Sequence, residues 1–465
     1  MLMFLPFTHC MIESRTVTDA HSRSSIPATL GLALGLMISP DSLVILGQNA
    51  GRMGLAVVPL LFPAMALHLF TAATYGEMNR CIPGPGGEIR LIRRALGAVP
   101  AAALLLCSRV LFVLCAAPLI LATAGYVFNE IFVHWFPNLG FSFLLLSLLL
   151  AVNLVGRRAA LAAQTMLVTV PLLALIILIA AGLVSHPLLP PRQTWDPGGR
   201  LIHPALLLLF LFMGHDLAAT AFPESQGVRM RIRAICTGIV SMALLFAAWG
   251  FLSASFVAPA RLAESTIPHV IAARAIIGDT GRVLIGIAVL GGSAAAVNAL
   301  FFSVSRIMAA MADDGLLPSR LSGSGGEPRL AVIVVALGPA AMMALGMAGE
   351  PETEIYARAA FLFWLLLFGA VDFSLLRLRR SQHLPLPMGV LMSFLGMMAA
   401  VVALLILDSQ GVQLGGFMMG IALLAVAVVV GIRKKGGSTR CMSDAKRPGQ
   451  GDSPICPAGS EEMKP

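Results

Sequence analysis

Ionisable and polar residues lie at four places inside long apolar stretches, and their types limit the chemistry they could do. They are Ser39, Pro40 and Asp41, then Arg109, then His215 and Asp216 after Gly214, then Asn298. A carboxylate can bind a cation or an amine, an arginine can bind a carboxylate, and histidine exchanges protons near neutral pH. The pattern indicates binding of a small charged solute or transfer of protons.

Signatures of catalytic or metal sites do not occur in the sequence. The nine histidines are scattered, and there is neither an HExxH nor a GxSxG motif. The seven cysteines lack CxxC and CxxxC spacing, so we interpret them as packing residues. We therefore expect no catalytic residue, metal ion or cofactor, and a membrane-embedded enzyme is a distant alternative.

The elements that carry these residues are apolar enough to need lipid as their solvent. Of the 465 residues, 58% are hydrophobic and 12% are charged, whereas soluble domains carry about 25% charged residues. A helix of about 20 apolar residues crosses the hydrocarbon core of a bilayer. We predict an all-α membrane protein with about twelve transmembrane helices. They cover residues 27–47, 54–76, 98–128, 139–155, 160–184, 201–222, 234–257, 282–311, 330–348, 356–376, 387–407 and 413–432.

Basic residues decide the predicted orientation of these helices. Arginines gather in alternate loops and after the last helix, while the opposite loops carry fewer. Because cytoplasmic loops hold an excess of Lys and Arg, both termini should lie in the cytoplasm, with the chain in a bacterial inner (plasma) membrane. This distribution accounts for the net charge of +9, so the lipid bilayer is an expected partner and nucleic acid is not. Residues 1–26 are a predicted cytoplasmic segment and 433–465 a predicted disordered cytoplasmic tail.

Two of the predicted helices should be broken within the membrane. Pro40 inside the first helix removes a backbone hydrogen bond and clashes with the preceding turn. Ser39, Pro40 and Asp41 also form a helix-start pattern, with an N-cap, a proline at the first position and an acid in the first turn. In the sixth helix, Gly214 followed by two polar residues predicts a second break. Broken helices five spans apart are typical of transporters built from inverted repeats.

Four segments resemble those of one transporter family, in order and at similar spacing. They are Gly76-Glu77 with Pro83 to Glu88, Asn153 to Gly156 with Gln164, Gly214 to Asp216 with Glu224, and Asn298-Ala299, Ser305-Arg306 and Ala312 to Pro318. The last is close to an N-A…SR…ARDGLLP signature. On these segments the chain resembles the amino acid, polyamine and organocation permease superfamily, from residue 27 to about residue 330.

The resemblance implies a leucine-transporter-type fold, with a 5+5 inverted repeat and two extra helices. Within a transporter domain of residues 27–432, the repeats would cover 27–184 and 201–376 and the additional helices 387–432. It also implies a substrate site between the unwound parts of the first and sixth helices, flanked by the third and eighth. The residues at these places are Ile38, Ser39, Asp41, Ser42, Arg109, Phe212, Met213, Gly214, His215, Asp216 and Asn298.

Two departures from the family pattern bear on substrate and coupling. The family commonly has a glycine-rich break that holds a substrate carboxylate, whereas this chain has Asp41 there. A fixed carboxylate repels a substrate carboxylate unless it is protonated or paired. Many proton-coupled members also carry a lysine in the fifth helix, where this chain has Pro171. We therefore expect exchange, or an uptake route that does not need that lysine.

Asp41 and Arg109 each have two interpretations. Asp41 is a ligand for a cation or amine, or a carrier of protons; the alternative is that it caps the restarted helix, and these roles are compatible. Arg109 neutralises Asp41 or receives a substrate carboxylate; the alternative is that its long side chain extends to the cytoplasmic face.

The remaining polar residues also have alternative roles. His215 and Asp216, together with Asp41, are candidates for proton or ion coupling, or else they hold the unwound turn by hydrogen bonds. Asn298 and Ser293 either line the site or join helices by polar contacts. Gating ion pairs or solvated loops at the cytoplasmic ends are expected for Glu77, Glu88 and Asp314.

The sequence therefore predicts a secondary active transporter of small amino acids or related amines that works by alternating access. The alternative within transport is a permease or exchanger for cationic amines of the polyamine or ethanolamine type. Protons or a counter-substrate are possible additional partners. A channel or structural membrane protein would lack the centrally broken helices.

Overall fold

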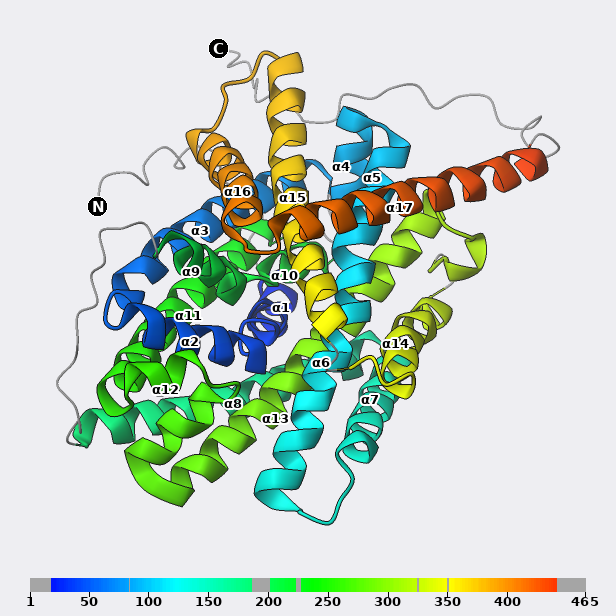
Figure 1. Cartoon of the computed structure of the whole chain (residues 1–465). Coiled ribbons are helices and arrows are strands. Elements are labelled where there is room, and N and C mark those ends of the chain that lie inside the picture. The colour runs from blue at the N-terminus through cyan, green and yellow to red at the C-terminus, as the bar shows by residue number, and fades with distance from the viewer. Residues whose placement is uncertain are drawn as a thin grey trace.

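The regular structure consists of helices throughout the described residues, which are 18–82, 84–185, 201–222, 227–323, 326–348 and 351–440 of a computed structural model. The helices are α1 (Thr18–Gly35), α2 (Pro40–Met53), α3 (Val57–Cys81), α4 (Gly87–Leu96), α5 (Ala98–Leu105), η1 (Leu106–Val110), α6 (Leu111–Val127), η2 (Phe128–Phe132), α7 (Asn138–Val155), α8 (Arg157–Val184), α9 (Ile202–Leu207), η3 (Leu208–Phe212), α10 (His215–Thr220), α11 (Val228–Phe256), α12 (Pro259–Ala263), α13 (Pro268–Asp313), η4 (Ser319–Leu321), α14 (Arg329–Ala344), α15 (Pro351–Ser381), α16 (Met388–Leu407) and α17 (Gly411–Arg440). Helix α1 and the short helix α10 lie in the middle of the bundle (Figure 1).

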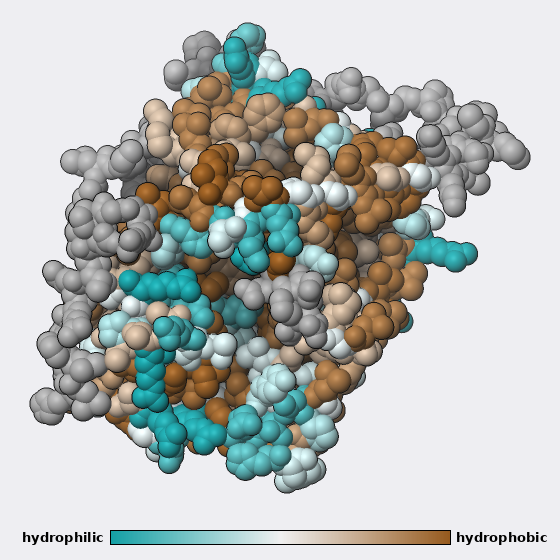
Figure 2. Space-filling view, viewed as in Figure 1, coloured by the Kyte–Doolittle hydropathy of each residue, from teal (hydrophilic) through white to brown (hydrophobic). Residues whose placement is uncertain are grey.

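The predicted all-α membrane protein is confirmed by the length and composition of these helices. Within the described ranges, ten helices are long and apolar enough to cross a membrane, and the bent pair α1 and α2 brings the number to eleven. The predicted ninth span corresponds to α14, which is apolar but shorter. Apolar side chains cover broad areas of the surface, as lipid requires, and hydrophilic ones gather at the lower edge, at the top and in patches across the centre of this face (Figure 2).

Some predicted boundaries differ from the structure. The predicted eighth span starts at residue 282, whereas α13 starts at Pro268, because a kink at Ile277 and Gly278 joins a further helical segment to it. Helix α1 starts inside the predicted terminal segment 1–26. Helix α17 continues to Arg440, past the predicted start of the tail at residue 433, and a disordered tail stays a prediction. The remaining tail, 441–465, lies outside the described residues. The division into two repeats and two additional helices stays a prediction.

The predicted break in the first span lies between α1 and α2, which meet at 55°. Helix α1 ends at Gly35, and Ser39 has extended backbone angles before α2 starts at Pro40. The Ser39 hydroxyl accepts a hydrogen bond from the backbone N–H of Ser42 at 3.4 Å. The N-cap, the proline at the start and the acid in the first turn are all present as predicted. The local sequence therefore ends one helix and starts the next.

The second predicted break lies in the sixth span, between η3 and α10. Met213 is extended, and Gly214 adopts the left-handed conformation with φ of 99°. Residues 208–212 before the break form a tighter 3₁₀ turn instead of an α-helix. Left-handed backbone is accessible to glycine at no steric cost, which explains the residue type at this point.

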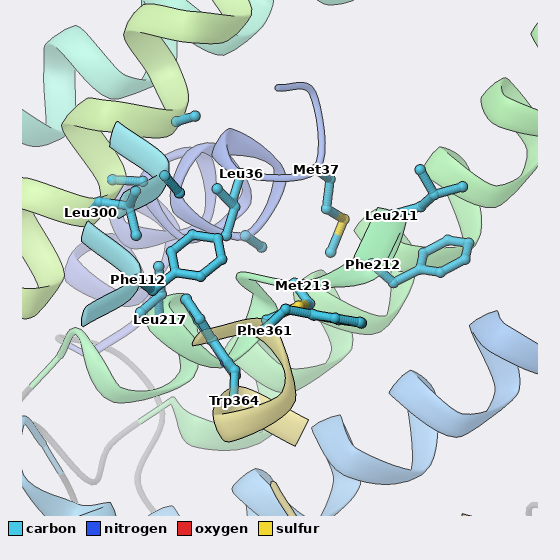
Figure 3. Packing of buried hydrophobic residues seen from close by; sticks show 14 of the residues in the cluster. Leu36, Met37, Phe112, Leu211, Phe212, Met213, Leu217, Leu300, Phe361 and Trp364 are labelled. Carbon is cyan, nitrogen blue, oxygen red and sulfur yellow. The ribbon is translucent and has the colours of Figure 1, made fainter. Parts of the chain in front are cut away.

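The two breaks pack directly against each other. A β-carbon added to Gly214 would lie 2.7 Å from the β-carbon of Leu36, in the turn after α1. On α13, Gly292 leaves space for the backbone carbonyl of Ile38. Figure 3 shows Leu36, Phe112 and Trp364 gathered around this point. Glycine thus permits three backbone segments to approach closely in the centre of the protein.

A buried amide network holds the neighbouring helices around the first break. The Gln164 side chain donates to the carbonyls of Gly31 and Ala295, at 2.9 and 3.1 Å. The Asn298 amide donates to Gln164 Oε1 and to the Ala160 carbonyl. Its oxygen accepts from Asn153 Nδ2 at 2.8 Å. These bonds join α1, α7, α8 and α13.

The placement of Asn298 in the substrate site is therefore a correction to the sequence prediction. All three polar functions of its amide are engaged with protein groups, and the side chain is fully buried. Of the two roles considered, joining helices by polar contacts is the one the structure supports. The eighth-span signature thus includes a packing residue at this position.

We predict that Gly214→Ala destabilises the protein by about 2 to 5 kcal/mol, because alanine is strained at positive φ and its methyl group would overlap Leu36. The measurement is chemical or thermal unfolding of the purified protein in detergent. The matched control is Gly415→Ala on α17, where an added β-carbon meets nothing within 4 Å. Equal stability of the two variants would contradict the packing of the breaks.

Candidate functional site

The predicted site residues lie on the two breaks and on the helix that flanks them. The break of the first span carries Ile38, Ser39, Asp41 and Ser42, and that of the sixth span carries Phe212, Met213, Gly214, His215 and Asp216. Arg109 lies on η1. All of these residues are buried except Asp41, which is partly exposed. The structure brings the two breaks together at Leu36 and Gly214 and joins Arg109 to Asp216. Within the described ranges, the Asp41 side chain forms no ion pair or hydrogen bond with these residues.

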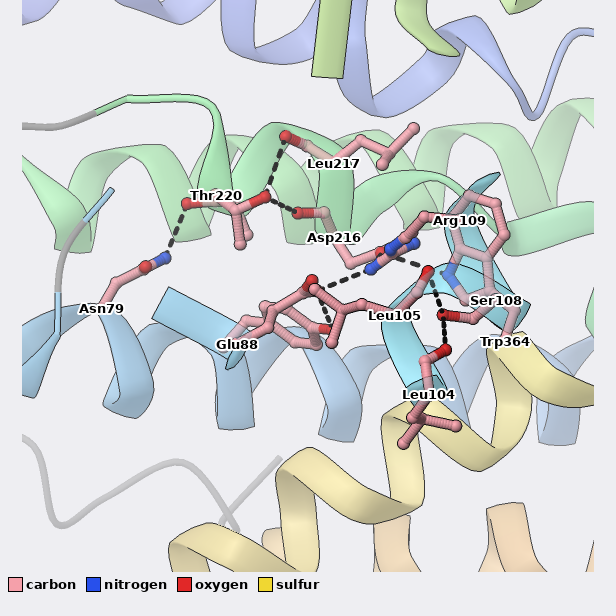
Figure 4. A network of polar contacts seen from close by, with 12 residues as sticks. Asn79, Glu88, Leu104, Leu105, Ser108, Arg109, Asp216, Leu217, Thr220 and Trp364 are labelled. Atoms are coloured by element: carbon pink, nitrogen blue, oxygen red, sulfur yellow. Dashed lines mark hydrogen bonds and ion pairs between the residues drawn. The ribbon is translucent and has the colours of Figure 1, made fainter. Parts of the chain in front are cut away.

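Arg109 is the centre of a buried charge cluster. It lies in a π-helical turn, a local widening of the helix that is frequent at functional sites. Its guanidinium donates to Glu88 Oε1 at 2.6 Å and also forms an ion pair with Asp216 (Figure 4). The side chains of all three residues are at most 1% exposed. The cluster therefore joins η1 to the broken sixth span and to α4.

Two aromatic residues complete this cluster. The Tyr75 hydroxyl donates to Glu88 Oε1 at 2.5 Å, and Trp364 Nε1 donates to Asp216 Oδ2 at 3.1 Å. The Arg109 guanidinium also lies 4.2 Å from the centre of the Trp364 ring, a cation–π contact. Helices α3 and α15 are thus held against the same arginine.

The cluster has two acidic groups for one arginine, so it carries an excess negative charge when both acids are ionised. Burial raises the pKa of the Glu88 carboxyl above its ordinary value, and the neighbouring Arg109 opposes this shift. An acid with a raised pKa takes up a proton more readily than it would in water.

Arg109 and Glu88 both require corrections to the sequence prediction. Among the described residues, Arg109 pairs with Glu88 and Asp216 and not with Asp41. Its side chain is fully buried, so the alternative in which it extends to the cytoplasmic face is also wrong. Glu88 was expected in a gating pair or a solvated loop, but it is buried beside Arg109 because α4 packs against the bundle.

A pair of buried histidines lies beside the charge cluster. The rings of His68 on α3 and His215 meet edge to face, with centroids 5.2 Å apart. His215 Nδ1 faces the Phe212 carbonyl at 3.0 Å, and His68 Nε2 faces the Leu209 carbonyl at 2.9 Å. Both nitrogens therefore carry a proton. The second nitrogen of each ring has no hydrogen-bond partner within the described part of the chain.

Asp41 is the exception among the acidic residues at the breaks. It lies in the first turn of α2, next to the N-cap Ser39. Within the described ranges its carboxylate forms no ion pair, in contrast to Glu88 and Asp216. An anion in the first turn is stabilised by the helix dipole, so this position suits an acid; a ligand role for Asp41 stays a prediction.

Comparison with known proteins identifies the family. The model of the amino acid permease family matches residues 25–430. The chain belongs to this family. The permease is 23% identical over 419 residues to the inner membrane transport protein YbaT of Escherichia coli (strain K12), which covers 87% of this chain and 95% of that protein. It is accordingly a secondary transporter and a multi-pass membrane protein, and not an enzyme.

Solved structures show the same fold for the permease. It is similar to a mutant of the manganese transporter of Eremococcus coleocola, with a TM-score of 0.60 and 13% identity, over 90% of this chain and 96% of that one. The same transporter bound to an aromatic bis-isothiourea substituted compound gives a TM-score of 0.59 and 14% identity, over 93% and 98%. At this identity the likeness concerns the fold alone, which is that of the leucine-transporter type.

Ion pairs join the ends of helices far apart in the permease sequence. Glu77 on α3 binds Arg80 of the same helix at 2.9 Å and Arg379 of α15 at 2.8 Å. Arg90 on α4 binds Asp314 after α13 at 3.2 Å. The ion pairs expected for Glu77 and Asp314 are therefore present, while their role in gating stays a prediction.

Sequence reasoning missed Tyr75, Trp364 and His68. These residues looked like ordinary members of apolar helices, and their partners are distant in the sequence. Only for Tyr75 did the sequence hold a usable signal, because this residue directly precedes the Gly76-Glu77 motif. Its hydroxyl binds Glu88 of the same motif segment.

We predict that Tyr75→Phe destabilises the permease by about 1.5 to 3 kcal/mol, because the Glu88 carboxylate loses a buried hydrogen-bond donor. The measurement is equilibrium unfolding in detergent. Tyr126→Phe is the matched control, since the Tyr126 side chain is 60% exposed. If both variants were as stable as the wild type, Tyr75 would not support the charge cluster.

Proposed function

We propose that this permease moves small amino acids or related amines across the bacterial inner membrane by alternating access, with the substrate held between the breaks of the first and sixth spans. The observation that carries this proposal is the contact of the two breaks at Leu36 and Gly214. Membership of the amino acid permease family supports the substrate class. The predominance of basic residues in alternate loops supports cytoplasmic termini.

Asp41 is the proposed partner of the substrate's amino group. Its carboxylate is partly exposed and forms no ion pair with a described residue. Amino acids and amines both carry a positive amino group, which such a carboxylate attracts. The charge would be worth more here than in water, because the surroundings are apolar.

The state of Arg109 favours a cationic amine as a second candidate. Two carboxylates already bind its guanidinium, and its side chain is fully buried. A substrate carboxylate would therefore have to displace Glu88 or Asp216, or bind free backbone N–H groups at the breaks. An amine of the polyamine or ethanolamine type needs no such partner.

Binding requires the contact between the two breaks to open. Leu36 occupies the position next to Gly214, so a substrate between the breaks must separate them. Such separation would pull Asp216 away from Arg109, or move η1 together with α10. We propose that alternating access includes this movement, with Asp41, His215 and Asp216 as candidates for coupling to protons or to a counter-substrate.

The absence of a lysine at position 171 supports exchange as one mode of transport. Pro171 on α8 packs against Gly291 of α13, where an added β-carbon would lie 2.8 Å from the proline ring. The position therefore serves helix packing and carries no titratable group. Coupling in this permease would depend on other residues.

The experiment is a thermal-shift screen of the purified permease against amino acids and amines. A ligand that binds the folded state raises its melting temperature by mass action. We expect hits among solutes with a positive amino group, with amines above amino acids if the second candidate holds. Stabilisation by carboxylates without an amino group, and by no amine or amino acid, would contradict the proposal.

We predict that Asp41→Asn abolishes both the thermal shift and uptake of the ligand found in this screen, because it removes the unpaired charge at the break. The variant should still reach the membrane in normal amounts, since Ser39, the N-cap of α2, and Pro40 at its start are unchanged. The control is Asp279→Asn, because the Asp279 side chain is 80% exposed. Normal uptake by Asp41→Asn would reduce Asp41 to a helix cap.

A further inference from the structure

A second buried carboxyl group lies away from the breaks, where α3, α15 and α16 meet. Asp372 on α15 is surrounded there by the hydroxyl groups of Thr71 and Thr74 on α3 and Ser393 on α16. All four side chains are at most 1% exposed. Neither carboxyl oxygen of Asp372 has a hydrogen bond of good geometry within the described part of the chain.

The protons of the surrounding hydroxyls are already used. Thr71 donates to the Leu67 carbonyl at 3.0 Å, and Thr74 donates to the Phe70 carbonyl at 3.3 Å. The hydroxyls of Thr71 and Ser393 lie 2.9 Å apart. When the proton of Thr71 goes to the Leu67 carbonyl, Ser393 is the donor in that pair. In this arrangement the hydroxyls of Thr71, Thr74 and Ser393 turn lone pairs toward Asp372.

Charged groups do not compensate this carboxyl. The His, Tyr, Glu and Arg residues of α3, α4 and η1 are His68, Tyr75, Glu77, Arg80, Glu88, Arg90, Arg93, Arg94 and Arg109. Those that follow Asp372 on α15 are Arg377, Arg379 and Arg380, and α16 has no titratable side chain. Glu77, Arg80 and Arg379 pair with one another. Tyr75, Glu88 and Arg109 belong to the charge cluster. Among the described residues, none forms an ion pair with Asp372.

In this arrangement the site presents only acceptors, which a hydrogen-bond donor or a cation would complete. An ionised carboxylate without partners in an apolar interior costs many kcal/mol, and such a group neutralises instead. A proton on Asp372 meets this requirement with the atoms present, because the acid O–H then donates to the Ser393 or Thr74 oxygen. With Ser393 as acceptor, one chain of hydrogen bonds runs from Asp372 through Ser393 and Thr71 to the Leu67 carbonyl.

We propose that Asp372 is a proton-binding site of this permease, occupied when α3 is packed against α15 and α16. When α3 moves away, water reaches the carboxyl, its O–H bond breaks, and the proton passes to water and leaves a carboxylate. Return of α3 requires a proton to be taken up again. The role of this site in transport rests on the proposed function. Binding of a proton at Asp372 is independent of it.

The fold connects this site to the breaks. Trp364, Phe368 and Asp372 are four residues apart on α15 and so lie on one face of the helix. Trp364 binds Asp216 at the second break, and Phe368 contacts the ring of His215. Helix α3 is tied to the same broken span, because Asn79 Nδ2 donates to the Ala219 carbonyl at 2.6 Å. Movement of the broken span is therefore transmitted to α3.

The first test is infrared difference spectroscopy of the purified permease, which needs no transported substrate. At neutral pH the wild type should show the carbonyl stretch of a protonated carboxylic acid, and Asp372→Asn should lose it. Ser393→Ala keeps the acid but removes an acceptor, so the band should move to higher frequency. Ser374→Ala is the matched control, because Ser374 lies on α15 and donates to the Ala370 carbonyl. It should leave the band unchanged.

The second test measures accumulation of the ligand from the thermal-shift screen in liposomes with an imposed pH gradient. Accumulation by the wild type should depend on the gradient, and this dependence should be lost in Asp372→Asn and kept in Ser374→Ala.

Two results would overturn the proton site. One is that the wild type shows no carboxylic acid band, or that its band remains in Asp372→Asn. The other is a band that disappears when sodium is added at constant pH, which would identify a sodium ion as the occupant. If no substrate were transported but the band behaved as expected, the proposed function would fail and the proton site would stand.

Discussion

The structure depends on a buried arginine that must be neutralised where it lies. Arg109 is fully buried and binds two acidic partners, and removing both of them would leave its charge without compensation, at a cost of several kcal/mol. This requirement fixes the positions of Glu88 on α4 and Asp216 on α10 at the same time. Through Trp364 and Tyr75 it also holds α15 and α3. One cation thereby joins the broken sixth span to the elements that surround it.

Backbone breaks provide the other half of the site. Helices that end inside a membrane leave polar backbone groups that protein contacts or a bound solute must satisfy. Here the breaks lie against each other, with Gly214 next to Leu36 and Gly292 next to Ile38. Asp41 is partly exposed at the start of α2, on the restarted half of the first span. The proposed partner of an amino group and the buried ion pair of Arg109 are therefore separate features of the permease.

Local chemistry explains what could be predicted from the sequence. Ser39 and Pro40 act on their own backbone, and Gly214 permits a left-handed turn, so both breaks followed from residue types alone. The partners of Arg109 could not be predicted, because Glu88 precedes it by 21 residues and Asp216 follows at a far greater separation. Whether α4 is solvated or buried depends on tertiary packing. Asn298 was misplaced for the same reason, since its partners lie on α7 and α8. His68 and Asp372 gave no signal, because single polar residues in apolar helices do not reveal their neighbours.

The most direct measurement of the central claim is a double-mutant cycle on Arg109 and Asp216, with unfolding free energies of the wild type, Arg109→Met, Asp216→Asn and the double variant. If the buried pair holds the broken span in place, the two substitutions should couple by about 1 to 3 kcal/mol, with the double variant more stable than the sum of the single effects predicts. Effects that add to within about 0.5 kcal/mol would show that the arginine and the break are independent, and would contradict this account.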